Sequence, residues 1–331
     1  MITVLFFQTY IEDNGLSVIK LDYTSIEQNS EFYFFNLILL EMNGITCIVR
    51  RSIYPAGIST SFPLASFISI INSNFIFLDI DDSFNYKGIM YEGFKFAFIN
   101  NSNFRNLRCN KKTFFTRYGA IYFAGAGTKI KTSNNYRLIL KNSFFRDCNC
   151  IHGGSLAIIN INTVVIENCH FFNSSASDSG GNFIILSCKE VIINNVLMRS
   201  SKSLTSSAFS LNNIETSKIS NLIIESSFSI KENVISIENC VLAFFENIFV
   251  TKTNSFDKGG VFNIIRSKIE LFKILVFEAF SENNGGVIYL SGNSNLFVAN
   301  ANFINCSANM GGGIFIETAN TFISSSKFDL I

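Results

Sequence analysis

Apolar and polar residues recur at a fixed interval through the second half of the chain. The interval is marked by glycine doublets, whose second members are Gly154, Gly181, Gly260, Gly286 and Gly312. When the one wide gap is filled at the same interval, Ser207 and Asn233 take the missing places, and every step is 26 or 27 residues. A repeat of this length predicts a molecule built from stacked copies of one small unit.

Two apolar columns keep a constant distance from these repeat glycines. Two residues after each marker lie Leu156, Phe183, Phe209, Ile235, Phe262, Ile288 and Ile314, and four residues after it lie Ile158, Ile185, Leu211, Ile237, Ile264, Leu290 and Ile316. The residues between the two columns are a mixture of polar and apolar types. Alternation of this kind predicts a β-strand with one buried face.

An asparagine column lies fourteen residues after the marker. It consists of Asn168, Asn195, Asn221, Asn247 and Asn300, with Ile274 as its one interruption. Further apolar columns lie two residues before it and three residues after it, so each repeat predicts about three short strands. We expect the asparagines to form a ladder, in which each amide hydrogen-bonds to its neighbours and the partners are buried.

A unit of short strands without helical periodicity cannot enclose a core alone, and it must stack on copies of itself. The pattern therefore predicts an all-β fold, a single-stranded parallel β-helix with coils of about 26–27 residues stacked ~4.8 Å apart. The repeat glycines would supply a bend that side chains obstruct. Residues 142–331 form the regular coils of this prediction and residues 44–141 irregular ones, whereas residues 1–43 have no clear phase and are expected to cap the first coil.

The repeat motifs resemble those of the chlamydial polymorphic outer-membrane proteins and related protist repeat proteins. The doublets GGSL, GGNF, GGVF, GGVI and GGGI resemble that family's GGA[I/L/V] element, and FFEN (residues 244–247) and FVAN (residues 297–300) resemble its FxxN element. The resemblance covers roughly residues 88–331. It implies a right-handed, pectate-lyase-like β-helix at a cell surface, with an adhesive role and a protein or carbohydrate as its partner.

Charge and hydropathy restrict the partners further. Net charge is +1 and charged residues make up only 15% of the chain, with no basic stripe, so we expect no nucleic-acid binding. The N-terminal apolar run is too short for a secretory signal, and the apolar stretch at residues 32–40 is too short to span a bilayer. These features predict either an intracellular protein or a fragment of a longer one, and they leave localisation open.

Acidic residues give the best candidate for catalysis. Asp79, Asp81 and Asp82 lie close together, with Arg105 or Arg108 one coil later, and could act as acid and base or bind a cation. The alternative is that the three aspartates form a solvated loop edge. In the regular coils, no two carboxylates share a phase on adjacent coils, as a polysaccharide lyase or hydrolase would need.

Cysteine and histidine offer little further chemistry. Cys148, Cys150, His152, Cys169 and His170 do not follow a zinc-binding spacing, so we expect neither a metal nor a cofactor. Cys109 and Cys150 each follow a column phenylalanine by five residues and could form a disulfide if the register holds between them. Asn100, Asn173 and Asn305 begin N-glycosylation sequons, which can be glycosylated only if the chain is secreted.

The sequence therefore favours a non-catalytic β-helix repeat protein that acts in adhesion or recognition at a cell surface. A polysaccharide-active lyase or hydrolase on the same fold is one alternative. An intracellular structural repeat protein is the other.

Overall fold

The computed structural model contains only strands, turns and bends in the part of the chain that it describes. It describes the backbone of residues 2–330 apart from residues 7–9, 12–16, 23, 29–31, 36, 44–45, 51–57, 62–66, 79–88, 110–118 and 126–134. Side chains are described for residues 68–76, 91, 93–109, 119–125 and 135–329.

One strand of each coil belongs to the smaller of two parallel sheets. Within the described residues this sheet has 12 strands, each paired with the corresponding strand of the coils before and after it. Its members are β2 (Tyr10–Ile11), β5 (Phe32–Phe35), β8 (Ile58–Ser61), β11 (Ile89–Glu92), β14 (Ile121–Ala124), β18 (Leu156–Ile159), β22 (Phe183–Leu186), β25 (Phe209–Asn212), β28 (Ile235–Glu238), β30 (Phe262–Ile265), β32 (Ile288–Ser291) and β35 (Ile314–Ile316).

The remaining strands form a second parallel sheet that bends around the rest of each coil. In the described residues it has 25 strands. They are β1 (Ile2–Phe6), β3 (Ser17–Asp22), β4 (Thr24–Gln28), β6 (Leu37–Asn43), β7 (Thr46–Arg50), β9 (Phe67–Ile71), β10 (Asn74–Leu78), β12 (Phe96–Asn100), β13 (Asn103–Arg105), β15 (Arg137–Lys141), β16 (Phe144–Arg146), β17 (Asn149–His152), β19 (Thr163–Glu167), β20 (His170–Phe172), β21 (Ser175–Ser179), β23 (Glu190–Arg199), β24 (Lys202–Ser203), β26 (Thr216–Glu225), β27 (Phe228–Ser229), β29 (Leu242–Ser255), β31 (Lys268–Ser281), β33 (Ser294–Ala299), β34 (Asn302–Cys306), β36 (Ala319–Ser324) and β37 (Lys327–Leu330).

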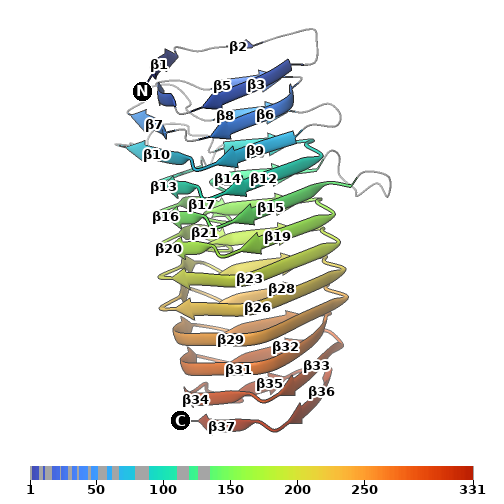
Figure 1. Ribbon diagram of the computed structural model, residues 1–331. Helices are drawn as coiled ribbons and strands as arrows, with labels where there is room; N and C mark the ends of the chain where they lie inside the picture. Colours follow the sequence, from blue (N-terminus) through green and yellow to red (C-terminus); the bar gives the residue numbers. More distant parts are fainter. Residues whose placement is uncertain are drawn as a thin grey trace.

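The chain winds as a parallel β-helix, as the periodicity predicts. In Figure 1 the strands at the front run from right to left and the chain returns behind them while it descends, which is a right-handed winding. Residues 1–43 show no clear repeat in the sequence, but their strands β1 to β6 pair in parallel with strands of later coils. Whether residues 1–43 act as a cap stays a prediction.

The two apolar columns form vertical rows inside the solenoid. Leu156 is paired with Phe183, Phe183 with Phe209, and the row continues to Ile314. Phe183, Phe209 and Ile237 are fully buried. The hydrophobic core is therefore a continuous column along the axis, in which each coil buries the inward side chains of its neighbours.

Glycine is required at the two positions of each doublet for different physical reasons. The first has a left-handed backbone, with φ of 64° at Gly153 and 67° at Gly285. The second has an ordinary φ but no room, because a Cβ on Gly286 would overlap the carbonyl oxygen of Gly312 in the next coil. The doublet thus lets the backbone of one coil approach the next at this corner.

Candidate binding face

The large sheet presents a narrow flat face between two sharp corners. We call it the second face; it is formed by β16, β20, the C-terminal halves of β23 and β26, and the middle parts of β29 and β31. One corner carries the asparagine column, and the other carries Asp147, Asn173, Ser200, Ser226, Lys252 and Glu278. Every residue of both corners over these coils has φ between 49° and 58°. The left-handed residues turn the chain sharply, so that only two side chains per coil face outward between them.

The first of these outward positions is occupied by a row of large and mostly apolar side chains, which we call the outer row. It consists of Phe144, His170, Leu197, Ile223, Phe249 and Leu275, each in register with the next. Phe144 is 44% exposed and Ile223 40% exposed, and the other four are partly exposed. Asparagine ends the row on both sides, at Asn103 and Asn302.

The second outward position carries the only charged side chains between the corners of this face. Its members are Arg146, Phe172, Arg199, Glu225, Thr251 and Phe277. Arg199 Nε donates a 2.6 Å hydrogen bond to Glu225 Oε2, and its guanidinium lies 6.0 Å from the centre of the Phe172 ring. The middle of the face is thus electrically balanced, with one ion pair beside an apolar row.

Such a surface is suited to binding a macromolecule. Soluble proteins rarely expose contiguous apolar patches of this kind without an interaction partner. The row lies on continuous parallel strands, so its side chains are held at the strand spacing of ~4.8 Å. Glu225 is bound to Arg199, and the face offers no pair of facing carboxylates for acid–base chemistry.

The outer row was not predicted from the sequence, although the apolar residues after the asparagines indicate it. Alternation predicts polar residues at outward positions, but the segments after the asparagines are continuously apolar, as in Asn221-Leu-Ile-Ile and Asn247-Ile-Phe-Val. One of each three apolar residues in these segments must face outward. Aligning the repeats on the asparagines, rather than on the glycines, would have revealed the row.

The asparagine column lies on the outside of the solenoid. Asn195 Nδ2 donates to Asn168 Oδ1 at 2.7 Å, and Asn247 Nδ2 donates to Asn221 Oδ1 at 3.3 Å, but both bonds are solvent-exposed. The expectation that ladder partners are buried is therefore wrong. Asparagine is favoured here because it tolerates a left-handed backbone, with φ of 52° at Asn168 and Asn221.

The interruption of the column also differs from the prediction. Ile248 is paired with Ile274, so the residue in register with Asn247 is Lys273, with φ of 56°, and Asn300 continues the same column. Some coils have 26 residues and others 27, and the additional residue does not always lie at the same corner. Counting from the glycines therefore misplaces the interruption by one residue.

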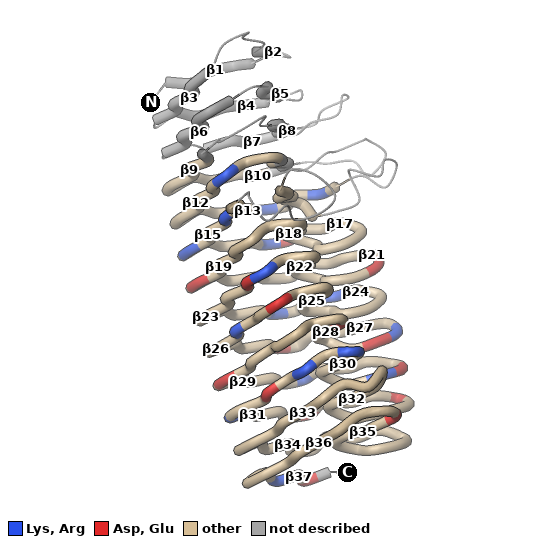
Figure 2. The backbone as a smooth tube through the Cα atoms, turned by 90° about the vertical axis from the view of Figure 1, so that its right-hand side faces the viewer, with Lys and Arg blue, Asp and Glu red and all other residues tan. Residues whose placement is uncertain are grey.

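A catalytic site at the three candidate aspartates stays a prediction. Asp79, Asp81 and Asp82 lie outside the part of the chain that is described. Arg105 is exposed at the end of β13. In the described part of the chain, Figure 2 shows the charged residues as small separate groups of both signs along the coils.

Free cysteines occupy a repeated structural position. Cys148, Cys169, Cys188, Cys240 and Cys306 are buried, and each follows a corner residue with a left-handed backbone. Each thiol donates to the carbonyl oxygen two residues earlier, as Cys169 does to Glu167 at 3.2 Å. Ser73, Ser102, Ser143 and Ser267 make the same bond, so cysteine here replaces a turn-stabilising serine.

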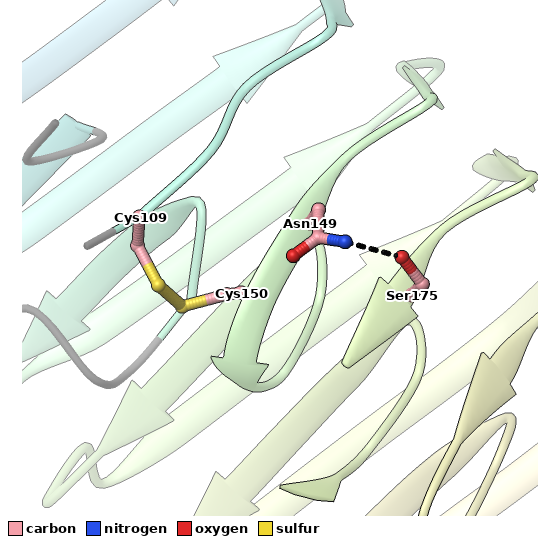
Figure 3. Close-up of a disulfide and its surroundings, with 4 residues drawn as sticks. All are labelled: Cys109, Asn149, Cys150 and Ser175. Carbon is pink, nitrogen blue, oxygen red and sulfur yellow. Dashed lines mark hydrogen bonds between the residues drawn. A yellow bond between two sulfur atoms is a disulfide. The ribbon is translucent and has the colours of Figure 1, made fainter. Parts of the chain in front are cut away.

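The possible pairing of Cys109 with Cys150 is present as a disulfide. Their Cα atoms are 4.9 Å apart, and Arg108 and Asn149 beside them are paired as neighbours in stacked coils. Figure 3 shows the bond next to β17, where Asn149 Nδ2 also donates to Ser175 Oγ at 2.8 Å. The disulfide links two stacked coils across a sequence separation of 41 residues, longer than the regular repeat.

The histidines are separated from the free thiols. His152 Nδ1 lies 3.1 Å from Asp178 Oδ2 and 3.0 Å from Ser179 Oγ, outside the solenoid. His170 belongs to the outer row, where its ring lies 4.7 Å from that of Phe144. Among the residues with described side chains, no three of His, Cys, Asp and Glu are grouped as a metal site would require.

A second polar group lies on the outer side of the smaller sheet. Tyr289 donates its hydroxyl to Glu317, and the Lys258 ammonium lies 4.8 Å from the centre of the Tyr289 ring. Burial raises the pKa of the nearby Glu232 carboxyl, against the opposing effect of Lys258. Arg266 pairs with Glu238 on the same side. Tyr289 therefore links Lys258 and Glu317 across neighbouring coils, and Arg266 and Glu238 form a separate ion pair.

Comparison with protein-family models, curated proteins and solved structures gives no match. The resemblance to the polymorphic outer-membrane proteins therefore stays a prediction. No helix within the described part of the chain is long and apolar enough to cross a membrane.

Proposed function

We propose that this protein is a non-catalytic β-helix scaffold that recognises a macromolecular partner at a cell surface through the outer row. The outer row is the observation that supports this proposal most strongly. From Phe144 to Leu275, successive coils place a large, mostly apolar side chain at the same outward position, where core packing requires none. Selection for binding accounts for such a row.

The disulfide supports an extracellular location. Disulfides persist in oxidising compartments and are rare in the reducing interior of cells. The Cys109–Cys150 bond is formed between coils that the solenoid already holds side by side. Mass spectrometry of the native protein would distinguish the compartments, since an intracellular repeat protein would carry both cysteines as thiols.

Binding and turnover should be measured on the same panel of immobilised cell-surface glycans and extracellular proteins. We expect saturable binding without product release, lost in Phe249→Arg and retained in Val241→Arg, because Val241 is 69% exposed at a different corner. Cleavage of a bound polymer would favour the polysaccharide-active alternative. Equal binding by both variants would exclude the outer row as the contact surface.

A further inference from the structure

We infer that the outer row binds a second copy of this chain, face to face and antiparallel. This inference rests on the proposed function, because it names the partner of the same surface. The first reason is the repeat itself. Side chains spaced at ~4.8 Å along the axis meet a partner side chain at every coil only on a surface of the same spacing, and sheets pack face to face. A second copy of this chain has the same spacing, because its coils are stacked in the same way.

The symmetry of the outer row gives the second reason. The row has its midpoint between Leu197 and Ile223, and asparagine ends it on both sides. A two-fold axis along the strands at this midpoint places Leu197 opposite Ile223 of the second copy, and by the same rotation His170 opposite Phe249 and Phe144 opposite Leu275. Every member of the row then faces another member, as an isologous interface requires.

Charge decides the relative direction of the two copies. With the two-fold axis at the midpoint, Arg199 of each copy lies opposite Glu225 of the other, since these residues are neighbours in register. The ion pair within each chain then becomes part of a four-charge cluster with alternating signs. A two-fold axis parallel to the solenoid would reverse the strand direction, so that with the outer rows in contact the two Arg199 side chains would lie on opposite sides of the row and neither would face Glu225 of the other copy.

The size of the face predicts a weak dimer. The six strands of the row extend over roughly 29 Å at ~4.8 Å per strand, and five residues per strand give a width of roughly 16 Å. About 450 Å² would be buried on each copy, so that the total lies near the lower limit of ~1,000 Å² for specific interfaces. We therefore expect association in the micromolar range.

Sedimentation velocity of the full chain over a range of roughly 1 to 100 μM tests this inference. We expect a concentration-dependent monomer–dimer equilibrium. Ile223→Arg should raise the dissociation constant at least about tenfold, because it places two cations in the middle of the apolar row. Val241→Arg adds the same charge at another corner and should sediment like the unmodified chain.

A pair of charge variants keeps the test valid if Ile223→Arg fails to fold. Arg199→Glu and Glu225→Arg should each self-associate more weakly, and an equimolar mixture of the two should dimerise again. A chain that stays monomeric throughout, or an Ile223→Arg variant that folds and dimerises normally, would overturn the inference. A monomeric chain that still binds a member of the partner panel would leave the proposed function standing.

Discussion

At the scale of single residues, the corners of the solenoid depend on a few left-handed positions. Asparagine occupies most of the column that borders the outer row, but lysine is accepted there at Lys273 with φ of 56°. A backbone requirement explains this tolerance better than a requirement for amide hydrogen bonds. The stacked amides add exposed hydrogen bonds, which contribute little to stability in water.

Substitutions of Asn221 distinguish these two contributions. Asn221→Ala should lower the free energy of unfolding by about 1 kcal/mol, because a Cβ without a local hydrogen-bonding group is strained in the left-handed region. Asn221→Gly removes the amide but relieves the strain, so it should cost less than alanine in a denaturant titration. If glycine is as harmful as alanine, the amide ladder rather than the backbone is the source of stability.

The buried thiols should be chemically silent in the folded protein. Burial raises the pKa of Cys169 to about 12, with similar values for Cys148 and Cys188. Because the raised pKa favours the neutral thiol, almost no thiolate exists near pH 8, and alkylation should be slow until the chain unfolds. Peptide mapping after iodoacetamide treatment with and without denaturant measures this. Rapid labelling of Cys169 in the native protein would contradict its placement inside the corner.

At the scale of strands, one side of each short strand supplies the core and the other side is free to vary. β28 shows the contrast within three residues, since Ile237 is fully buried and Ser236 faces outward. Ile237→Asp should lower the free energy of unfolding by about 3 kcal/mol or more, because it buries an unpaired charge.

Ser236→Asp is the matched control on the same strand and should change the melting temperature only slightly. Thermal unfolding followed by circular dichroism compares the two variants. Similar effects of both substitutions would mean that the strand does not separate an inner from an outer side.

Glu232, in the loop before β28, gives a pH-dependent prediction. Because burial raises its pKa in the folded state above the ordinary value of 4.5, the ionised carboxylate opposes folding at neutral pH. Glu232→Gln should therefore raise the melting temperature near pH 7, and the gain should disappear below pH 4.5, where both states are protonated. A gain that is constant across this range would show that burial of the charge is not the cause.

Periodicity predicted the elements that depend on one buried position per coil. The inner rows through Phe183 and Phe209 were found because burial selects one class of residue at a constant spacing. The register of the asparagine column failed at Lys273, since coils gain residues at different corners. The outer row was missed because alternation says only which side of a strand is buried, and not what a partner requires of the other side.

Spacing alone could not decide whether Cys109 and Cys150 meet. Their disulfide depends on how the coils align across a sequence separation of 41 residues, which departs from the interval of 26 or 27 residues. Asp79, Asp81 and Asp82 lie beside irregular coils, outside the described residues. The outer row could not be recognised from residue type, because its apolar residues are of the same types as those in the core.

At the scale of the whole molecule, a single geometric relation produces both the core and the second face. Each coil places its side chains directly over those of the coil before, so that inward rows fill the axis and outward rows form linear surfaces. A slip of one residue between coils would exchange inside and outside along a whole strand.

Engineered cross-links measure this relation most directly. Ser210 and Ser236 are outward neighbours in register, at a strand spacing of ~4.8 Å that suits a disulfide, and Cys109–Cys150 already provides such a bond between coils. We expect Ser210→Cys with Ser236→Cys to form an intramolecular disulfide under mild oxidation, detected by peptide mapping, and Ser210→Cys with Glu238→Cys to form little. Efficient bonding of the second pair in place of the first would contradict the stacking on which both the core and the outer row depend.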